Sequence, residues 1–211
     1  MIIDELPSHI VYSPSVIELV TVIAESCLFL ENASELSRAD FIDRAVKILP
    51  LLYLKAGLVQ KPVSEFDDDP ERFVTEEDYL YVKEQIEQLL GPDDSYLEVF
   101  HPDMALSDTP IAAFISESLA DVYQEIKNFA ANYQTMDIDI MNDSLVSLLD
   151  AFEFHWGQKA LNALRALHVL RYSESFDMDA KEKPQSLADK IDRNSFVGFL
   201  KNEDESYDSL L

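Results

Sequence analysis

The sequence predicts an all-α fold, an irregular antiparallel bundle of about five main helices followed by an acidic, partly disordered C-terminal tail. Apolar residues recur at helical spacing in five segments, and each segment starts with a capping residue. No segment alternates apolar and polar residues among β-branched ones, so we expect no sheet. The chain has 211 residues, 47% of them hydrophobic, and can build one core. We therefore expect a single helical domain over residues 1–201 and an acidic tail over 202–211.

The first two helices are marked by their starting residues. Ser13 suits the N-cap position, and Pro14 then occupies the first helical position, where proline is favoured. Ser37 with Asp40 resembles a capping box at the start of the second helix. Gly57 suits the C-terminal end of that helix.

Residues 58–74 interrupt the helical pattern. Pro62 and Pro70 flank a run of three aspartates, which indicates an exposed acidic loop. Thr75 caps a third helix, which we expect to end at Gly91 because a proline follows. The stretch 92–107 is again irregular, but its apolar residues indicate that it packs onto the domain and includes a short helical turn.

The two longest predicted helices come next. Thr109 followed by Pro110 starts the fourth helix, over residues 109–136. After a short break at 137–141, Asn142 opens a fifth helix that extends to Tyr172, or about 45 Å. Beyond Ser173 the sequence becomes polar, and we expect one short helix near residues 186–193.

The charge balance is strongly acidic. Sixteen Lys and Arg stand against 41 Asp and Glu, which gives a formal net charge of −25. This charge disfavours binding to nucleic acid and to anionic membrane surfaces. It favours solubility, which is the simpler explanation, and also a basic protein partner or a cation.

Cysteine usage and hydropathy indicate the compartment. Cys27 is the single cysteine and lies in the apolar stripe of the first helix, so it has no internal disulfide partner. The first residues contain no basic region before a long apolar run, so we expect no signal peptide. The most apolar stretch, residues 16–30, contains Glu18 and Glu25 and is too short to span a bilayer. We therefore expect a cytoplasmic protein.

Common catalytic motifs are missing from the sequence. The four glycines are far apart, so no loop can cradle a phosphate, and no nucleophile elbow, zinc-protease histidine pair or cysteine pair occurs. Glu98 and His101 have the Glu-x-x-His spacing of di-iron bundles, but such sites need two of these motifs, and Pro102 follows at once. We therefore expect no metal and no cofactor.

The segment from Phe152 to His168 carries the most informative side chains. It holds the only tryptophan, Trp156, and two of the four histidines. Gly157 lies inside the predicted helix, where glycine costs about 1 kcal/mol relative to alanine. The simplest explanation is close approach of a neighbouring helix. His155 and His168 lie about 140° apart around one helix, so they cannot share one ion, and each is expected to be a hydrogen-bonded core histidine.

Three acids recur at intervals of four on the fourth helix, namely Glu117, Asp121 and Glu125. They lie opposite its apolar stripe, and the simpler interpretation is a solvated acidic face. The alternative is that they line a groove that takes a cation or a basic partner. Arg165 and His168 share a face of the fifth helix and, if buried, would require a carboxylate.

Two segments of the last two predicted helices are distinctive: one runs from Ser118 to Lys127, and the other joins His155-Trp156-Gly157 to the run from Ala163 to His168. They resemble a family of bacterial proteins known only as a domain of unknown function. The resemblance implies an all-α domain of about this length with no assigned activity and no catalytic residues. The positions that match the characteristic sequence of the family are Asp121, Tyr123, His155, Trp156, Gly157, Arg165 and His168.

Three functions remain open from the sequence. The leading hypothesis is a non-enzymatic protein-interaction module that binds a basic partner through its acidic surface, including Asp67, Asp68 and Asp69. The alternative is a small-molecule or metal-binding helical enzyme with a pocket between the helices at 109–136 and 142–172. Its candidate binding residues are Asp121, Tyr123, His155, Trp156, Arg165 and His168. A third hypothesis is a mimic of nucleic acid that blocks a DNA-binding protein.

Overall fold

A computed structural model describes residues 9–98 and 111–173. This part of the chain is mostly helical, as predicted, and it also contains one small sheet. The helices are α1 (Pro14–Glu31), α2 (Arg38–Gly57), α3 (Glu76–Leu90), α4 (Ile115–Tyr133), α5 (Ile138–Ala151) and α6 (Gly157–Arg171), and the strands are β1 (Ser95–Glu98) and β2 (Ile111–Phe114).

The predicted starts of the first three helices are confirmed. Pro14 is the first residue of α1. The Ser37 hydroxyl accepts a hydrogen bond from the Asp40 amide at 3.1 Å at the start of α2. Thr75 and Asp78 form a capping box before α3, in which each side chain accepts from the other residue's backbone amide. Caps of this kind act within four residues, which is why the sequence alone reveals them.

The expectation of no sheet is wrong. Strands β1 and β2 pair antiparallel, with Ser95 opposite Phe114. Residues 111–114 therefore belong to a strand, and the fourth helix begins at Ile115 rather than at residue 109. The buried Asp94 carboxylate caps this helix, because it accepts from both the amide and the hydroxyl of Ser116 at 2.7 Å. Strands of four residues are too short for an alternating pattern to be visible.

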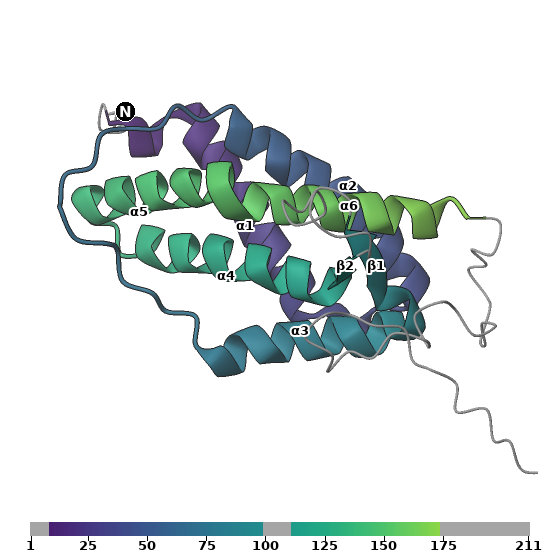
Figure 1. The fold of residues 1–211 in the computed structure, drawn as a ribbon. Helices are drawn as coiled ribbons and strands as arrows, with labels where there is room; N and C mark the ends of the chain where they lie inside the picture. The colour runs from purple at the N-terminus through teal and green to yellow at the C-terminus, as the bar shows by residue number, and fades with distance from the viewer. Residues whose placement is uncertain (1–8, 99–110, 174–211) are drawn as a thin grey trace, which may run out of the picture.

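The fifth predicted helix begins four residues earlier than expected. The Asp137 carboxylate accepts from the Asp139 and Ile140 amides at 3.1 and 3.3 Å and starts α5 at Ile138. A π-helical turn at Phe152–Trp156 joins α5 to α6. Figure 1 shows the two as one long rod, which agrees with the predicted single helix. It ends at Arg171, one residue before the predicted end.

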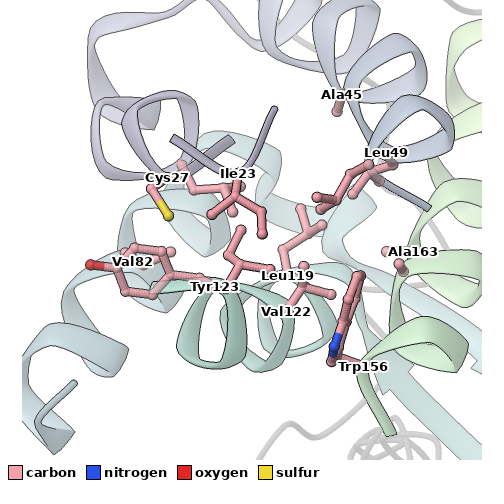
Figure 2. Close-up of a cluster of buried hydrophobic side chains, with 14 of the residues drawn as sticks. Ile23, Cys27, Ala45, Leu49, Val82, Leu119, Val122, Tyr123, Trp156 and Ala163 are labelled. Atoms are coloured by element: carbon pink, nitrogen blue, oxygen red, sulfur yellow. The ribbon is translucent and has the colours of Figure 1, made fainter. Parts of the chain in front are cut away.

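Helix α4 lies in the middle of the bundle. It packs against α1, α3, α5 and α6, while α2 packs against α6. In Figure 2 the side chains of Leu119 and Val122 from α4 lie between Ile23 of α1 and Trp156. These four side chains are 0% exposed. The core is therefore built around α4 and also includes Val82, Ile86 and Leu90 of α3.

Several predictions fall outside the described residues: the Thr109-Pro110 start, His101, the short helix near 186–193 and the acidic tail at 202–211. Within the described ranges, no helix is long and apolar enough to cross a lipid bilayer.

Candidate functional site

A long connector, residues 58–75, joins α2 to α3 and crosses the ends of other helices. Figure 1 shows it as the blue trace that passes α5 and α4 on its way to α3. The sequence predicts this segment as an exposed loop, and most of its residues are exposed. Its backbone is nevertheless held in place by side chains from α4 and α5.

The strongest anchor of the connector is the buried carboxylate of Asp143 on α5. It accepts hydrogen bonds from the Glu65 and Phe66 amides at 2.7 and 2.8 Å. The Ser64 hydroxyl and the Asn142 amide add bonds at 2.9 and 3.0 Å. Burial by itself would raise the pKa of Asp143, but these four donors outweigh it and hold the pKa below its ordinary value. Docking of the connector therefore favours the ionised form of this carboxylate.

Two asparagines of α4 hold the second half of the connector. The Asn128 side-chain oxygen accepts from the Phe73 and Val74 amides at 2.7 and 2.9 Å. The Asn132 amide donates to the Glu71 carbonyl at 2.8 Å. Both asparagines are buried, so the connector provides hydrogen-bond partners where water is excluded, and the Asn132 amide also donates to the Asn128 carbonyl at 3.0 Å.

The connector borders three of the four cavities described in the structure. One of about 400 Å³ lies where the connector leaves α2 and is mostly apolar in its lining, with Tyr53, Leu149 and Phe152. One of about 130 Å³ lies beneath residues 69–72. One of about 380 Å³ lies beside Phe73 and Val74. The connector is therefore a common wall of these cavities.

The three acids of α4 take cationic partners from the same chain. Asp121 accepts from the Tyr79 hydroxyl at 2.9 Å and pairs with Lys159 of α6 at 3.0 Å. Glu125 pairs with Arg72 of the connector at 2.7 Å, and Glu117 lies 3.9 Å from Lys83 of α3. The Asp121 and Glu125 side chains are 19% and 13% exposed, so the expectation of a solvated acidic face is wrong for these two. The alternative interpretation is that these acids line a groove that takes a cation. In the structure, Lys159 and Arg72 of the same chain already supply the positive charges beside Asp121 and Glu125.

Tyr123 lies in the core between α4 and α1 (Figure 2). Its hydroxyl donates to Glu31 at 2.9 Å, and Lys127 binds the same carboxylate oxygen at 2.6 Å. Burial, with the nearby Glu31 carboxylate, raises the pKa of Tyr123 far above its ordinary value. Burial also raises the pKa of the Cys27 thiol to about 12, so this thiol is neutral.

The π-helical turn explains the tryptophan and the glycine. Trp156 is fully buried, and its indole nitrogen donates to the Leu148 carbonyl at 3.0 Å. A Cβ at position 157 would lie 2.4 Å from the Phe152 carbonyl oxygen and 3.0 Å from its ring. The close contact that requires Gly157 is therefore with the preceding turn of the same helix. The predicted cause, approach of a neighbouring helix, is wrong.

The histidines of this segment are not in the core. His155 and His168 are exposed, which corrects the expectation of two core histidines, and the His168 ring packs on Tyr172 with centroids 4.6 Å apart. Arg165 is exposed and lines a separate cavity of about 220 Å³ beside β1. None of the four described cavities is lined by two of the residues Asp121, Tyr123, His155, Trp156, Arg165 and His168. The structure does not bring these candidates together.

Of the Glu-x-x-His spacing, the structure describes only Glu98, which lies in a strand. Glu98 ends β1 and accepts from the Asn162 amide at 3.0 Å. Among the described residues, no group of three or more His, Cys, Asp or Glu side chains is placed to hold a metal ion.

Sequence reasoning misses the anchors of the connector, namely Asn128, Asn132, Asn142 and Asp143. One signal could have indicated Asn142, but not the others. It lies four positions after Ile138 and three before Leu145, so it falls on the apolar stripe of α5, which faces the rest of the molecule. Polar residues at such positions indicate that something polar packs on them.

Residues 10–173 match the family described as a domain of unknown function, DUF5063. The chain belongs to the DUF5063 family. This confirms the resemblance of its two segments, and the matched DUF5063 region includes the connector and every residue lining the cavities. The crystal structure of protein BF1032 from Bacteroides fragilis is similar, with 40% sequence identity and a TM-score of 0.71 over 81% of this chain and 100% of that one. No curated protein matches the chain.

Proposed function

We propose that this DUF5063 protein is a non-enzymatic interaction module that binds a basic protein partner through the acidic surface of its connector. The observation that carries the proposal is the anchoring next to the acidic run. Asp67, Asp68 and Asp69 are exposed, and the Phe66 amide immediately before them is bonded to the buried Asp143 carboxylate. Acids held on an ordered backbone lose less entropy on binding than acids on a free loop.

The charge of the connector supports a basic partner. The connector contains five acids and two bases, and both bases are committed to other helices, Lys61 to Asp150 and Arg72 to Glu125. Within the described part of the chain, no ion pair involves Asp67, Asp68 or Asp69. Unpaired carboxylates of one sign steer a partner of the opposite sign and raise its association rate.

Apolar side chains beside the acids support a specific interface. Phe66 is 52% exposed and Val63 is 84% exposed, although both lie on an ordered backbone. Protein interfaces combine apolar or aromatic anchors with charges around them. The connector offers both within a few residues, which suits a partner segment that mixes basic and apolar residues. The net charge of −25 argues against nucleic acid as a ligand. We assign the role to the cytoplasm, whose reducing conditions suit the single free cysteine, Cys27.

The experiment compares two triple variants with the unaltered protein. The test variant is Asp67→Asn, Asp68→Asn and Asp69→Asn. The control, Glu25→Gln, Glu35→Gln and Glu84→Gln, removes the same charge from exposed positions outside the connector. A partner is first captured from lysate with the unaltered protein, in a one-to-one ratio, and purified. Its affinity for the test variant should be roughly tenfold lower than for the unaltered protein, and its affinity for the control almost unchanged. Equal affinity for both variants would show that the connector is not the recognition surface.

A further inference from the structure

The cavity beside the end of the connector lies where four segments of the chain meet. The end of α1, the end of the connector, the first half of α3 and the second half of α4 enclose a volume of about 380 Å³. Ligand pockets of proteins have volumes of about 300–1,000 Å³, so this cavity has room for a side chain of another protein. Its aromatic and charged lining residues are Phe73, Tyr81, Tyr123, Glu31, Asp78 and Lys127.

Two of the aromatic side chains in the lining are open to solvent. Phe73 of the connector is 42% exposed, and Tyr81 of α3 is 57% exposed. In the part of the chain that the structure describes, neither ring packs on another aromatic ring or on a cationic side chain. The Phe73 amide is fixed by its bond to Asn128 at 2.7 Å, so this ring stands on an ordered backbone. The faces of such rings attract cations.

A network of three side chains forms the charged side of the cavity. The Tyr123 hydroxyl and the Lys127 ammonium group both donate to the Oε1 atom of Glu31, at 2.9 and 2.6 Å. Figure 2 shows that the Tyr123 hydroxyl points out of the hydrophobic cluster. Among the described residues, no group donates to the other oxygen of Glu31, Oε2, and the Glu31 side chain is 25% exposed. Glu31 therefore has one oxygen left for a donor from outside the chain.

The charges around the cavity favour a cation. Lys127 is charged at neutral pH, because its hydrogen bond to Glu31 raises its pKa. Asp78 adds a second carboxylate, close enough for its charge to act on both Lys127 and Tyr123. Two carboxylates thus stand against one ammonium group, which disfavours an anion. A guanidinium group suits the lining best, because it is planar, weakly hydrated and able both to stack on aromatic rings and to donate to a carboxylate.

We propose that this cavity receives the guanidinium group of an arginine side chain presented by the basic protein partner. The guanidinium group lies against the rings of Phe73 and Tyr81 and donates a hydrogen bond to Glu31 Oε2. Phe73 follows Asp69 by four residues, at most about 14 Å of chain, so a basic segment bound along the connector reaches the cavity. This inference rests on the proposed function and adds the residue that the partner must contribute.

The first test needs no protein partner. The full ¹⁵N-labelled chain is titrated with Nα-acetyl-arginine methylamide and followed by NMR, and the amide signals of Phe73, Val74 and Tyr81 should shift in a saturable way. The citrulline analogue has nearly the same shape but no charge, so it should bind roughly tenfold more weakly. The lysine analogue should bind several-fold more weakly, because its ammonium group is more strongly hydrated and does not stack.

A second titration identifies the source of the guanidinium group. A short peptide with lysines on both sides of one arginine should bind roughly tenfold more tightly than the blocked arginine, because its lysines also reach the acids of the connector. This gain should disappear in the Asp67→Asn, Asp68→Asn and Asp69→Asn variant, while binding of the blocked arginine persists. Equal affinity of the peptide and the blocked arginine would overturn the assignment to a protein partner.

Variants of the lining test each contact of the blocked arginine. Phe73→Ala and Tyr81→Ala should each weaken it about two- to fivefold, whereas Phe154→Ala, at a ring that is 74% exposed outside the cavity, should not. Glu31→Gln keeps an oxygen acceptor but removes the charge, so the preference for arginine over citrulline should shrink. Glu25→Gln, at an exposed position of the same helix, should leave that preference unchanged.

Three outcomes would overturn the cavity as an arginine site. They are the absence of saturable shifts, equal affinity for the arginine and citrulline analogues, and the same affinity in Phe73→Ala and Tyr81→Ala as in Phe154→Ala. Each of these can occur while the purified partner still distinguishes the acidic triple variant from its control. Failure of the cavity and failure of the proposed function are therefore separate results.

Discussion

Replacement of Asp143 by alanine tests whether the connector is held by this carboxylate. The substitution removes the acceptor of three connector bonds, from Ser64, Glu65 and Phe66 at 2.7–2.9 Å. Hydrogen bonds to charged groups contribute about 1.5–3 kcal/mol each. The freed donors belong to exposed residues and regain water, so we take about 1 kcal/mol for each bond. The expected loss in the free energy of unfolding is about 3 kcal/mol.

Urea unfolding and amide hydrogen exchange measure this effect together. The Glu65 and Phe66 amides should exchange faster in Asp143→Ala, because both lose their acceptor. Asp150→Ala on the same helix is the control, since it removes only an exposed ion pair with Lys61, which should leave the unfolding midpoint almost unchanged. A loss in Asp143→Ala below about 0.5 kcal/mol, with unchanged exchange, would refute the reasoning, because three charged bonds cannot cost so little.

The same carboxylate predicts a pH dependence. The pKa of Asp143 in the folded protein lies below its ordinary value of 3.8. The stability that it contributes is therefore fully present above that ordinary value and is lost as the pH falls through the folded pKa. The difference in unfolding free energy between the unaltered protein and Asp143→Asn should be constant near neutral pH and shrink in acid. A difference that grows in acid would contradict the assignment.

Two further predictions concern the core. In urea denaturation, Gly157→Ala should lower the free energy of unfolding by about 1–3 kcal/mol, because its Cβ would meet the Phe152 carbonyl at 2.4 Å. The control is Gly57→Ala, whose Cβ would have nothing within 4 Å. It should leave the free energy of unfolding unchanged or raise it by up to about 1 kcal/mol. Cys27, whose pKa is raised to about 12, should resist a thiol reagent at mildly alkaline pH until urea unfolds the protein. Rapid labelling of the folded protein would show that this thiol is accessible.

The features that the sequence reveals are those determined by neighbouring residues. Pro14, Ser37 and Thr75 mark helix starts because their effects reach only three or four positions along the chain. The hairpin is different, since Ser95 pairs with Phe114, 19 positions away, and neither strand is long enough to show a pattern. The π-helical turn is only partly visible in the sequence. Gly157 indicates an irregularity, but its contact with Phe152 requires the five-residue turn to be known.

For the candidate site, the sequence indicates some of the residues but not which of them contact one another. Asp121 and Tyr123 were identifiable, but their partners Tyr79 and Glu31 lie 42 and 92 positions away on other helices. Asp143 escapes for a similar reason, since a polar residue on a helix indicates a solvent-facing position until the packing of residues 64–66 on it is known. Long-range pairs of single polar side chains leave no periodic signal, and they are what organises this surface.

Apolar burial contributes to the order of the connector only near its two ends, where Val59 and Val74 pack against the core. Val63, Phe66 and Phe73 are 84%, 52% and 42% exposed. Ordering each backbone residue costs about 1–2 kcal/mol, and buried polar anchors such as Asn128 and Asp143 would cost more if they had no partners. The connector and the polar face of α4 and α5 therefore stabilise each other, and neither is favourable alone. A chain that needed only to join α2 to α3 could use a flexible loop, because loop closure depends weakly on length. An ordered connector with exposed acids and aromatics suits the binding surface proposed for it.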